Sequence, residues 1–600
     1  MGVDTLSDPD VSRLSIKSNR SVNITYRGDL ASTRPAFREW NLKFFDSEDK
    51  EEFEKGNISG VYFYRGAYPF STACIIVAVG NRILRGEVFG GTIEFFNLYT
   101  GIDRKWQRSF FINAEEILVW QNGKDYPLYW DGKKTNKMKP VYSSSLVGNT
   151  PMPIGNIMTY AHGRIFVATE QDLVYASNHF YSQGIGADKR EAVLKFSEST
   201  YPSSGDGFGA PSDLGQITYM NVVPRNPSTN GHGEVIVGCQ NGWFAINPTL
   251  QRNEWTRNDI QTIVENGKGN ASPTGAVIVN GDIWFRDTDN EISTLRTRIT
   301  EDENDVGESS VGADVTRYLN YDTPGSIEST FSGMFNRYLF FTVGHKKEES
   351  YVEGVFHRFS TGMVVADINR GSSFDKRNIR WDGLWTGPRV TGMIQGIIGG
   401  MKKGFVFSYG TDGINRIFSI SNERQDFLNK EYKKIKSHYL IGSLFDTKEP
   451  SSKTLERLSL TYKEVFESTD ISIDYSSDSF ECFSRLDEKT IGCDSICDQS
   501  IIENPKTKEV CHDGNTYRTM SGKIVTKPPC ENDDKNGLKL KTGSSFSVKI
   551  NIEGFAKIVR CDILSNKKDD IPMYQGSCPD ESSHCNGVVC CDELEFQYQF

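Results

Sequence analysis

The sequence predicts an all-β protein built around a β-propeller, and three observations lead to this expectation. Pairs of apolar strands recur along residues 58–425, the turns between them are of the Asn-Gly type, and glycine and aromatic residues are abundant. Asn and Gly accept the positive φ angles of the primed turns that match the twist of a hairpin. The 55 glycines and 12% aromatic residues favour short strands joined by tight turns.

Seven hairpins are predicted, at intervals of roughly 40 residues or near twice that spacing, which is the period of propeller blades. We therefore expect about six to eight blades, with one large β-sandwich or two stacked sandwiches as the alternative. The paired strands are Ala73–Val79 with Arg82–Val88, Ile117–Gln121 with Tyr126–Trp130, Ile157–Ala161 with Ile165–Thr169, Val235–Cys239 with Trp243–Asn247, Ala276–Val279 with Ile283–Arg286, Ser332–Phe335 with Tyr338–Val343, and Gly404–Tyr409 with Ile414–Ile420.

Two segments outside the hairpins also receive an assignment. An aromatic turn is expected at Trp381–Trp385, just before the last hairpin. Residues 1–57 are polar and charged and are expected to form an N-terminal arm, with one short strand within Arg20–Phe37. Ser47–Lys55 has acidic residues near its start, which suits the dipole of a solvated helix, with a loop as the alternative.

The pattern of apolar and polar residues changes after the predicted propeller at 58–425. Alternating apolar and polar residues in 426–600 predict a C-terminal β-sandwich. A long cysteine-rich loop at about 481–542 interrupts this sandwich, and a cysteine-rich tail follows at 561–591.

The crowding of cysteines in the C-terminal part indicates covalent or metal cross-links, because the insertion has few apolar residues of its own. An even number and irregular spacing favour disulfides formed after release from the reducing cytosol. The disulfide candidates are Cys482, Cys493, Cys497, Cys511, Cys530, Cys561, Cys578, Cys585, Cys590 and Cys591. Zinc is the alternative, although paired C-x2-C spacing is missing. Its candidate ligands are Cys493, Cys497, Cys578, His584, Cys585, Cys590 and Cys591.

Composition and motifs exclude several functions. The net charge of −11 argues against a protein that holds nucleic acid by its phosphates, although DNA can pass a wall that repels it. No H-E-x-x-H, G-x-S-x-G or P-loop motif is present, so we expect no enzyme, no catalytic residue and no cofactor. Asp287–Glu291 and Asn532–Gly537 resemble calcium loops faintly and are interpreted as turn acids. Cys74 and Cys239 lie in apolar strands and are expected in the core.

No apolar run reaches the roughly 20 residues that span a bilayer. The polar start, Met1–Arg20, has no signal-peptide pattern, so the chain is expected to be soluble and made in the cytoplasm.

Six segments, in order, resemble the tail nozzle proteins (tail tubular protein B type) of short-tailed bacteriophages. The resemblance covers roughly residues 30–480, with a weaker similarity at Ser544–Leu564. The matching segments are Arg34–Phe37, Phe111–Gly132, Met158–Ser177, Gly281–Arg296, Phe331–Val343 and Trp381–Ser421.

The resemblance implies a structural protein of the virion, made in the host cytoplasm and assembled as a homohexameric ring in the tail. Its neighbours would be the portal and adaptor on one side and tail fibre or distal tail proteins on the other. DNA would leave through the central channel during ejection without sequence-specific binding, and channel loops would act as a gate. The acidic segments Glu301–Glu308 and Ser47–Lys55 are candidate channel or gate segments, with solvated outer loops as the alternative. The cysteine-rich insertion is not part of the family's pattern.

Two other functions remain open from the sequence. One is a host-surface carbohydrate-binding propeller of the tail, in which Trp106, Trp120 and Trp130 would stack on sugars unless they pack in the core. The other is a polysaccharide-degrading propeller, because catalytic carboxylate pairs follow no local spacing rule.

Overall fold

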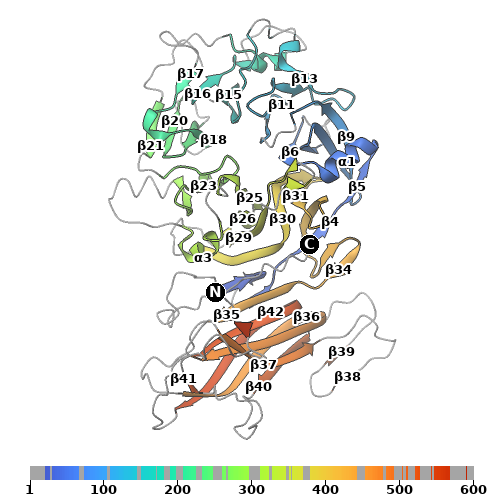
Figure 1. The fold of residues 1–600 in the computed structure, drawn as a ribbon, viewed down its shortest axis with the longest axis vertical. Helices are drawn as coiled ribbons and strands as arrows, with labels where there is room; N and C mark the ends of the chain where they lie inside the picture. Colours follow the sequence, from blue (N-terminus) through green and yellow to red (C-terminus); the bar gives the residue numbers. More distant parts are fainter. Residues whose placement is uncertain are drawn as a thin grey trace.

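The chain folds as an all-β protein, with sheets set around a ring at one end of the molecule and the long C-terminal strands at the other end (Figure 1). The computed structural model describes residues 20–27, 30–66, 73–103, 108–144, 147, 150–169, 172–180, 189–197, 207–223, 233–247, 260–264, 268–295, 311–322, 327–345, 351–352, 355–368, 379–441, 453–477, 482–491, 503–504, 509–510, 520–526, 542–543, 546–567 and 589–590.

Five separate sheets follow one another along the chain. The first contains β5 (Asn41–Phe44), β6 (Ile58–Tyr64), β7 (Cys74–Val79), β8 (Arg82–Phe89) and β9 (Thr92–Thr100). The second contains β10 (Phe110–Ala114), β11 (Ile117–Gln121), β12 (Leu128–Trp130) and β13 (Lys139–Pro140). The third contains β14 (Met158–Ala161), β15 (Arg164–Ala168), β16 (Leu173–Ala176) and β17 (Gly207–Gly209). The fourth contains β18 (Ile217–Val223), β19 (Glu234–Cys239), β20 (Trp243–Ile246) and β21 (Ile260–Val264). The fifth contains β22 (Ala276–Val279), β23 (Asp282–Arg286) and β24 (Ile292–Thr294).

A 19-stranded sheet takes in the remaining long strands. Its N-terminal members are β1 (Arg20–Val22), β2 (Ile24–Arg27), β3 (Leu30–Thr33) and β4 (Ala36–Glu39). Its middle members are β25 (Ser332–Phe335), β26 (Tyr338–His345), β29 (Ser360–Asp367), β30 (Arg380–Ile398), β31 (Met401–Tyr409), β32 (Asn415–Ser421), β33 (Asp426–Leu428) and β34 (Glu431–Lys433). Its C-terminal members are β35 (Lys436–Ile441), β36 (Lys453–Ser477), β37 (Cys482–Ile491), β40 (Met520–Thr526), β41 (Thr542–Gly543), β42 (Phe546–Lys567) and β43 (Val589–Cys590).

The remaining elements of the described part are short. Two small strand pairs are β27 (Tyr351–Val352) with β28 (Val355–Phe356), and β38 (Glu503–Asn504) with β39 (Glu509–Val510). The α-helices are α1 (Ser47–Lys55) and α3 (Thr316–Leu319), and single 3-10 turns lie at Val141–Ser143, Lys189–Leu194, Ser212–Leu214, Ala313–Val315 and Ile327–Ser329.

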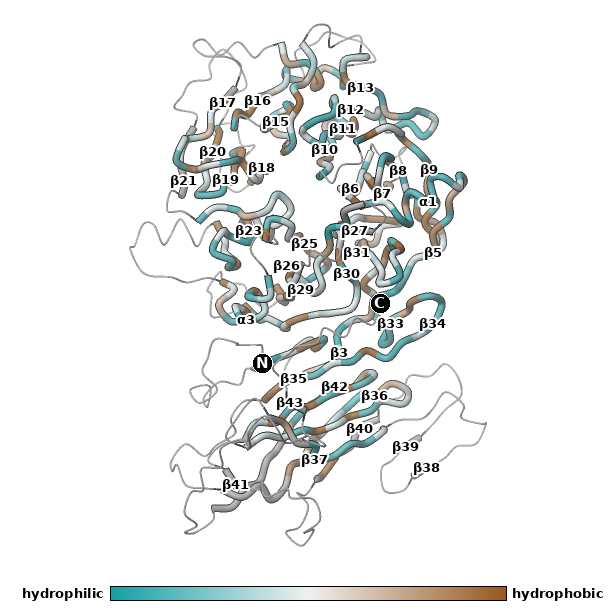
Figure 2. The backbone as a smooth tube through the Cα atoms, viewed as in Figure 1, coloured by the Kyte–Doolittle hydropathy of each residue, from teal (hydrophilic) through white to brown (hydrophobic). Residues whose placement is uncertain are grey.

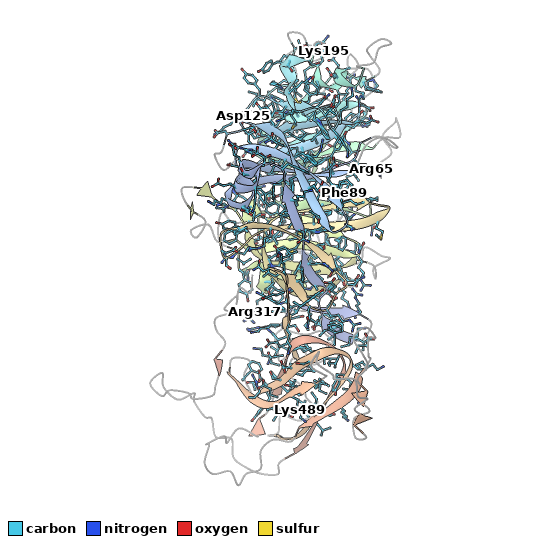
Figure 3. All side chains as sticks on the ribbon, turned by 90° about the vertical axis from the view of Figure 1, so that its right-hand side faces the viewer. Arg65, Phe89, Asp125, Lys195, Arg317 and Lys489 are labelled. Carbon is cyan, nitrogen blue, oxygen red and sulfur yellow. The ribbon has the colours of Figure 1, made fainter. Side chains whose placement is uncertain are left out.

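One edge strand of each sheet lies beside an edge strand of the next, which makes the arrangement a β-propeller. β6 contacts β10, β10 contacts β14, and β14 contacts β18. The fourth and fifth sheets share a hydrophobic core that includes Tyr219 of β18 and Ile283 of β23. β22 contacts β25, β25 contacts β30, and β30 returns to β6, so the series closes on itself. Brown, apolar stretches occur in strands of the ring and of the C-terminal part (Figure 2). Every residue of β7 is buried, as expected for a strand that is covered on both faces by neighbouring blades. Seen from the side in Figure 3, Lys195 and Lys489 mark opposite ends of the molecule.

All seven predicted hairpins are confirmed by strand pairing. The tight turns connect Val79 to Arg82, Ala161 to Arg164, and Phe335 to Tyr338. Asn280 and Gly281 have φ angles of 51° and 77°, as the primed turns require. The helix expected at Ser47–Lys55 is α1, and the side chain of Asp46 caps it by accepting from the Glu48 backbone amide at 2.9 Å.

The aromatic turn expected at Trp381–Trp385 was wrong, because these residues belong to β30. The pairing of β30 with β29 shifts register between Val365 and Ala366, opposite Asp382. This bulge reverses the alternation of the strand. Trp381 therefore packs into the core shared with the C-terminal strands, while Trp385 packs into the core formed with β26 and β31.

The C-terminal part is built on two long antiparallel strands, β36 and β42, which pair over most of their length. β40 adds to the first half of β36 and β37 to its second half. The long loop expected at about 481–542 was therefore wrong in part, because β37 and β40 lie within it. Apolar residues of these strands, including Leu460 and Ile550, share one hydrophobic core with Trp284 and Phe341 of the propeller.

The N-terminal segment differs from the expected arm with one strand, because Arg20–Glu39 forms four short strands. β1 pairs with β35, and β3 pairs with β42, so both join the C-terminal strands. β4 pairs with β32 of the propeller. The segment thus connects the two halves of the molecule (Figure 1).

Buried side-chain hydrogen bonds hold this segment against β30. The Asn23 side chain accepts from the Thr386 amide at 2.7 Å and donates to the Thr386 hydroxyl at 2.8 Å. The Asp382 carboxylate accepts from the Thr25 hydroxyl at 2.6 Å and the Tyr26 amide at 3.1 Å. The indole of Trp385 donates to the Ile24 carbonyl at 3.1 Å.

A buried ion pair fixes the end of the same segment. The Arg34 guanidinium donates to both oxygens of Asp426, at 2.9 and 2.7 Å, and to the side-chain oxygen of Asn23 at 3.0 Å. Asp426 also accepts from the Phe37 amide at 2.7 Å. Both side chains are almost completely buried, so water does not replace either partner.

Replacing Asp426 tests the energetic weight of this pair. We expect Asp426→Asn to lower the free energy of unfolding by about 3–5 kcal/mol, because it leaves a buried guanidinium without its countercharge. The matched control is Glu423→Gln, which removes the half-exposed partner of Arg38 in the neighbouring pair and is expected to cost about 0–1 kcal/mol. Urea unfolding measures the free energy of unfolding of both variants. Equal losses of stability in the two variants would contradict the expected weight of the buried pair.

Asp382 gives a pH-dependent prediction. Burial raises the pKa of its carboxyl to about 7, with Asp367 adding to the rise, while hydrogen bonds from Thr25 and Tyr26 and the charge of Arg337 oppose it. The folded state therefore keeps a proton that the unfolded chain releases near pH 4, and stability falls as the pH rises from about 4 to about 7.

Asp382→Asn removes this loss of stability. We expect its free energy of unfolding, relative to the natural chain, to improve by about 2–3 kcal/mol between pH 5 and pH 8. Asp412→Asn is the control, because Arg416 lowers the pKa of the Asp412 carboxyl. Thermal unfolding of the variants and the natural chain at pH 5 and pH 8 measures this change. If the stability of Asp382→Asn relative to the natural chain is the same at both pH values, the raised pKa of Asp382 is refuted.

Candidate functional site

The strands that contact one another in this closed series surround the axis of the propeller, and we call them the inner strands. They are β6, β10, β14, β18, β22, β25 and the second half of β30, Val390–Ile398. None of the residues in these strands is Asp, Glu, Lys, Arg or His. The inner strands therefore present an uncharged wall, which neither holds nor repels phosphate groups strongly.

Arginine side chains lie at the end of the propeller where the inner strands begin. Arg108 lies two residues before β10 and donates to the hydroxyls of Ser272 at 3.1 Å and Thr274 at 3.3 Å, just before β22. Its guanidinium also donates to the carbonyl of Glu328, before β25. The neighbouring Ser109 amide donates to the Ser59 carbonyl of β6 at 3.0 Å. Because β10 and β22 belong to the second and fifth sheets of the ring, the Arg108 side chain crosses the axis.

Two further arginines lie at this end. Burial lowers the pKa of the Arg108 guanidinium to about 9, the positive charge of Arg358 lowers it further, and Glu328 opposes the shift. Burial also lowers the pKa of Arg358. The guanidinium of Arg389 lies 5.0 Å from the ring centre of Phe359, next to Arg358 in the chain. We call Arg108 and Arg358 the axial arginine cluster.

The histidine beside this cluster adds no charge near pH 7. The ring of His357 stacks on Tyr409 with centroids 4.0 Å apart and an interplanar angle of 13°. Burial lowers the pKa of His357 to about 4, so the imidazole is neutral at neutral pH. Glu328, whose side chain is exposed, is the carboxylate that acts on both Arg108 and Arg358.

No sequence pattern predicts the axial arginine cluster. Its members and their partners are spread over residues 108 to 358, and no spacing rule connects them. An arginine just before a predicted inner strand is the sequence pattern that could point to such a cluster, but this pattern is too common to be specific.

The cysteines expected in the core are confirmed there. Cys74 and Cys239 are buried, neither forms a disulfide, and burial raises the pKa of each thiol to about 12. Among the disulfide candidates, Cys561 is half-buried on β42 and packs on the shared core. The candidates outside the described residues are Cys493, Cys497, Cys511, Cys530, Cys578, Cys585 and Cys591, together with His584 of the zinc alternative.

The calcium-like segment at Asp287–Glu291 is confirmed as a turn with structural acids. The Asp287 carboxylate accepts from the amides of Asp289 at 3.1 Å and Glu291 at 2.8 Å, and from the Ser293 hydroxyl at 2.8 Å. Asn532–Gly537 lies outside the described residues. In the described part of the chain, no three His, Cys, Asp or Glu side chains come together as a metal site.

The aromatic platforms of the carbohydrate-binding alternative are corrected by the structure. Trp120 and Trp130 are 0% and 2% exposed and pack in the core between the first two sheets, so neither is available to a sugar. Trp106 lies outside the described residues. An exposed aromatic pair that sequence reasoning missed is Tyr126 with Tyr142, whose rings meet edge to face at 5.4 Å.

The candidate gate segments lie apart from the axial arginine cluster or outside the described chain. Ser47–Lys55 forms α1, which contacts β5, β8 and β32, and buries Phe53 among them. Glu301–Glu308 lies outside the described residues. Their places in a ring of copies stay predictions.

Comparison with known proteins adds little to this picture. No family model matches the chain, and no curated protein matches it. Solved structures titled BBS1N in complex with ARL6DN, soaked with mercury or with lead, are each 11% identical to it. The first has a TM-score of 0.22 and covers 38% of this chain and 61% of its own. The second has a TM-score of 0.24 and covers 43% and 72%. The chain thus spans less than two thirds of the first neighbour, and similarity at this level carries no argument about function.

Among the helices of the described residues, none combines the length and apolar character needed to cross a bilayer.

One disulfide pairing follows from the backbone register. β37 and β43 pair antiparallel, with Cys482 directly opposite Cys590. Directly opposed residues of such a pair have Cα atoms about 4.5–5.5 Å apart, within the range of disulfides. We expect a Cys482–Cys590 crosslink in the oxidised protein.

Peptide mapping of the oxidised chain without reduction checks this pairing. A crosslinked peptide containing residues 482 and 590 is expected, and it should separate after reduction. Cys482→Ser is the matched variant, in which Cys590 should become alkylatable. Crosslinks that join Cys482 to another cysteine would contradict the register.

Proposed function

We propose that this chain is a structural virion protein of a short-tailed phage, a tail nozzle whose ring forms the conduit and gate for DNA ejection. The observation that carries the proposal is the order of the six segments that resemble such proteins. Phe111–Gly132, Met158–Ser177 and Gly281–Arg296 each contain a hairpin of a different sheet of the ring. Phe331–Val343 contains the β25–β26 hairpin. The resemblance therefore follows the blades and is not confined to one motif.

We infer seven blades within the proposed range. The five separate sheets would be five blades, and β25, β26, β29 and the first half of β30 would form the sixth. The second half of β30 with β31, β32 and β4 would form the seventh. In this arrangement the N-terminal strand β4 closes the ring. The C-terminal strands would form the added β-domain, a sandwich with a cysteine-rich insertion.

A conduit between copies fits the geometry better than a conduit through one propeller. Arg108 crosses the axis of the single chain and bonds to the fifth sheet, so that hole is occupied by the protein's own side chain. DNA would therefore pass through the centre of a ring of copies. A closed cyclic ring is the usual result of a head-to-tail interface whose rotation closes.

A rigid wedge suits such a ring. The core shared by Trp284, Trp381 and the C-terminal residues Leu460 and Ile550 joins the propeller to the added domain. Close packing of this kind resists bending. The net charge of −11 favours a ring that DNA passes without adhering. The proposal assigns the chain no catalytic role.

Imaging of the purified protein, alone and with the portal and adaptor of its own phage, tests the proposal. We expect six-fold rings by electron microscopy, or addition of six copies to the portal–adaptor complex. Light scattering gives the mass independently. A chain that stays monomeric and adds nothing to the portal complex would overturn the proposal, and a strong glycan-array signal would favour a receptor-binding role.

A further inference from the structure

Two hairpin turns of the propeller consist of consecutive glycines, and we call them the glycine tips. Gly90 and Gly91 connect β8 to β9, and Gly399 and Gly400 connect β30 to β31. All four residues have positive φ angles, as a two-residue hairpin turn requires. A Cβ atom built on any of them would have no atom of another part of the chain within 4 Å, so both tips stand clear of the rest of the described structure.

The two glycine tips lie at the same end of the propeller. β6 and β8 run in the same direction, because both pair antiparallel with β7. β30 runs beside β6 in this direction too: a Cβ atom at Gly392 would meet Val61, and one at Gly396 would meet Phe63. The turns that follow β8 and β30 therefore project from the end opposite the axial arginine cluster, because Arg108 lies where β6 and β10 begin.

Large apolar side chains are exposed at both glycine tips. Phe89 precedes the first glycine pair and is 53% exposed. Ile397 and Met401 lie on either side of the second pair and are 42% and 64% exposed. Val88 and Ile398 instead pack against the core between the first sheet and β31. Each tip is thus held at its base by the core and carries apolar groups at its end.

Basic side chains lie at the same end of the propeller. Arg65 directly follows β6, and Lys402 lies at the start of β31; both are exposed. Within the part of the chain that the structure describes, neither side chain takes part in an ion pair or a hydrogen bond. The acidic residues of the β8–β9 hairpin, Glu87 and Glu94, both have basic partners of their own. The exposed apolar groups are therefore accompanied by positive charge that these carboxylates do not neutralise.

A flat partner fits the two glycine tips better than a protein surface does. Neighbouring residues of a strand point to opposite faces, so Phe89 faces away from the core on which Val88 packs. The tips are thus two separate projections that one plane can meet together. Three half-exposed apolar side chains offer roughly 300 Å², whereas a stable protein interface buries about 800 Å² on each partner. Apolar groups flanked by Lys and Arg suit the boundary of a bilayer, where cations meet lipid phosphates.

We propose that the glycine tips bind the surface of a lipid bilayer that contains anionic headgroups. Phe89, Ile397 and Met401 enter the boundary between headgroups and acyl chains, and Arg65 and Lys402 lie at the level of the phosphates. The net charge of −11 does not prevent this contact, because charges more than about 8 Å away are largely screened at physiological salt. The contact is made by a single chain and does not rest on the proposed conduit, which concerns the ring.

Vesicle flotation of the full chain tests this contact. Vesicles of phosphatidylcholine mixed with phosphatidylglycerol should carry the chain upward, and vesicles of phosphatidylcholine alone should carry less of it. Phe89→Ser and Met401→Ser should each weaken binding to the mixed vesicles by about tenfold, because they remove apolar area that the bilayer covers. Lys402→Gln should weaken this binding by about fivefold and leave binding to phosphatidylcholine alone unchanged.

Tyr126→Ser is the matched control, because Tyr126 is 65% exposed and lies at the opposite end of the propeller. It follows β11, whose last residue, Gln121, pairs with Phe110 at the start of β10. Its replacement should leave vesicle binding unchanged, and circular dichroism checks that every variant is folded.

Three outcomes would overturn the proposal. The first is the absence of flotation with the natural chain, and the second is equal binding by the natural chain and Phe89→Ser. The third is a loss of self-association in Phe89→Ser while the natural chain ignores both kinds of vesicle, which would assign the tips to a contact between copies. Six-fold rings are scored separately by electron microscopy without vesicles, so failure of the bilayer contact and failure of the conduit are distinguishable.

Discussion

The arrangement of the two halves depends on the contact between the N-terminal strands and β30. Asn23 is the centre of this contact, because its side chain bonds to Thr386, Arg34 and the carbonyl of Lys436. It has a φ angle of 56°, a conformation that Asn tolerates better than most residues. One amide side chain therefore links β30 of the propeller, the N-terminal segment and the start of β35. A residue without both donor and acceptor groups at this point would leave several buried partners unsatisfied.

This dependence explains why buried polar groups occur at a junction where apolar packing would give greater net stability. A buried ion pair such as Arg34 with Asp426 contributes little net stability compared with a well-packed apolar pair. It does favour one arrangement, because its hydrogen bonds are satisfied only when β4, β30 and β33 meet in a single register. The apolar core around Trp381 and Tyr439 supplies the larger part of the attraction without fixing direction. Cohesion and specificity thus come from different groups in the same junction.

The hairpins could be predicted because their turns depend on residues next to each other in the sequence. Features that depend on residues far apart in the sequence could not be predicted in this way. Turns such as Asn280-Gly281 can be predicted from the sequence, because few residues other than Asn and Gly accept positive φ angles. The turn between β10 and β11 uses Glu115 and Glu116, with φ angles of 48° and 68°, and no preference of glutamate points to it. Trp381–Trp385 was mistaken for a turn because the bulge that sends its two indoles into different cores depends on β29. The four N-terminal strands are short and find their partners up to about five hundred residues away, so only the tertiary structure defines them.

The candidate site was beyond sequence reasoning for a related reason, since Arg108, Ser272 and Arg358 meet only after the ring closes. Its position also bears on where DNA would pass under the proposed function. Arg108 bonds to Ser272 and Thr274, so one of the protein's own side chains lies across the axis of the single chain. A passage for DNA must be wide and must not hold phosphate. Under the proposal, surfaces of several copies would build this passage together, and the acidic balance of the chain would keep phosphate from adhering to it.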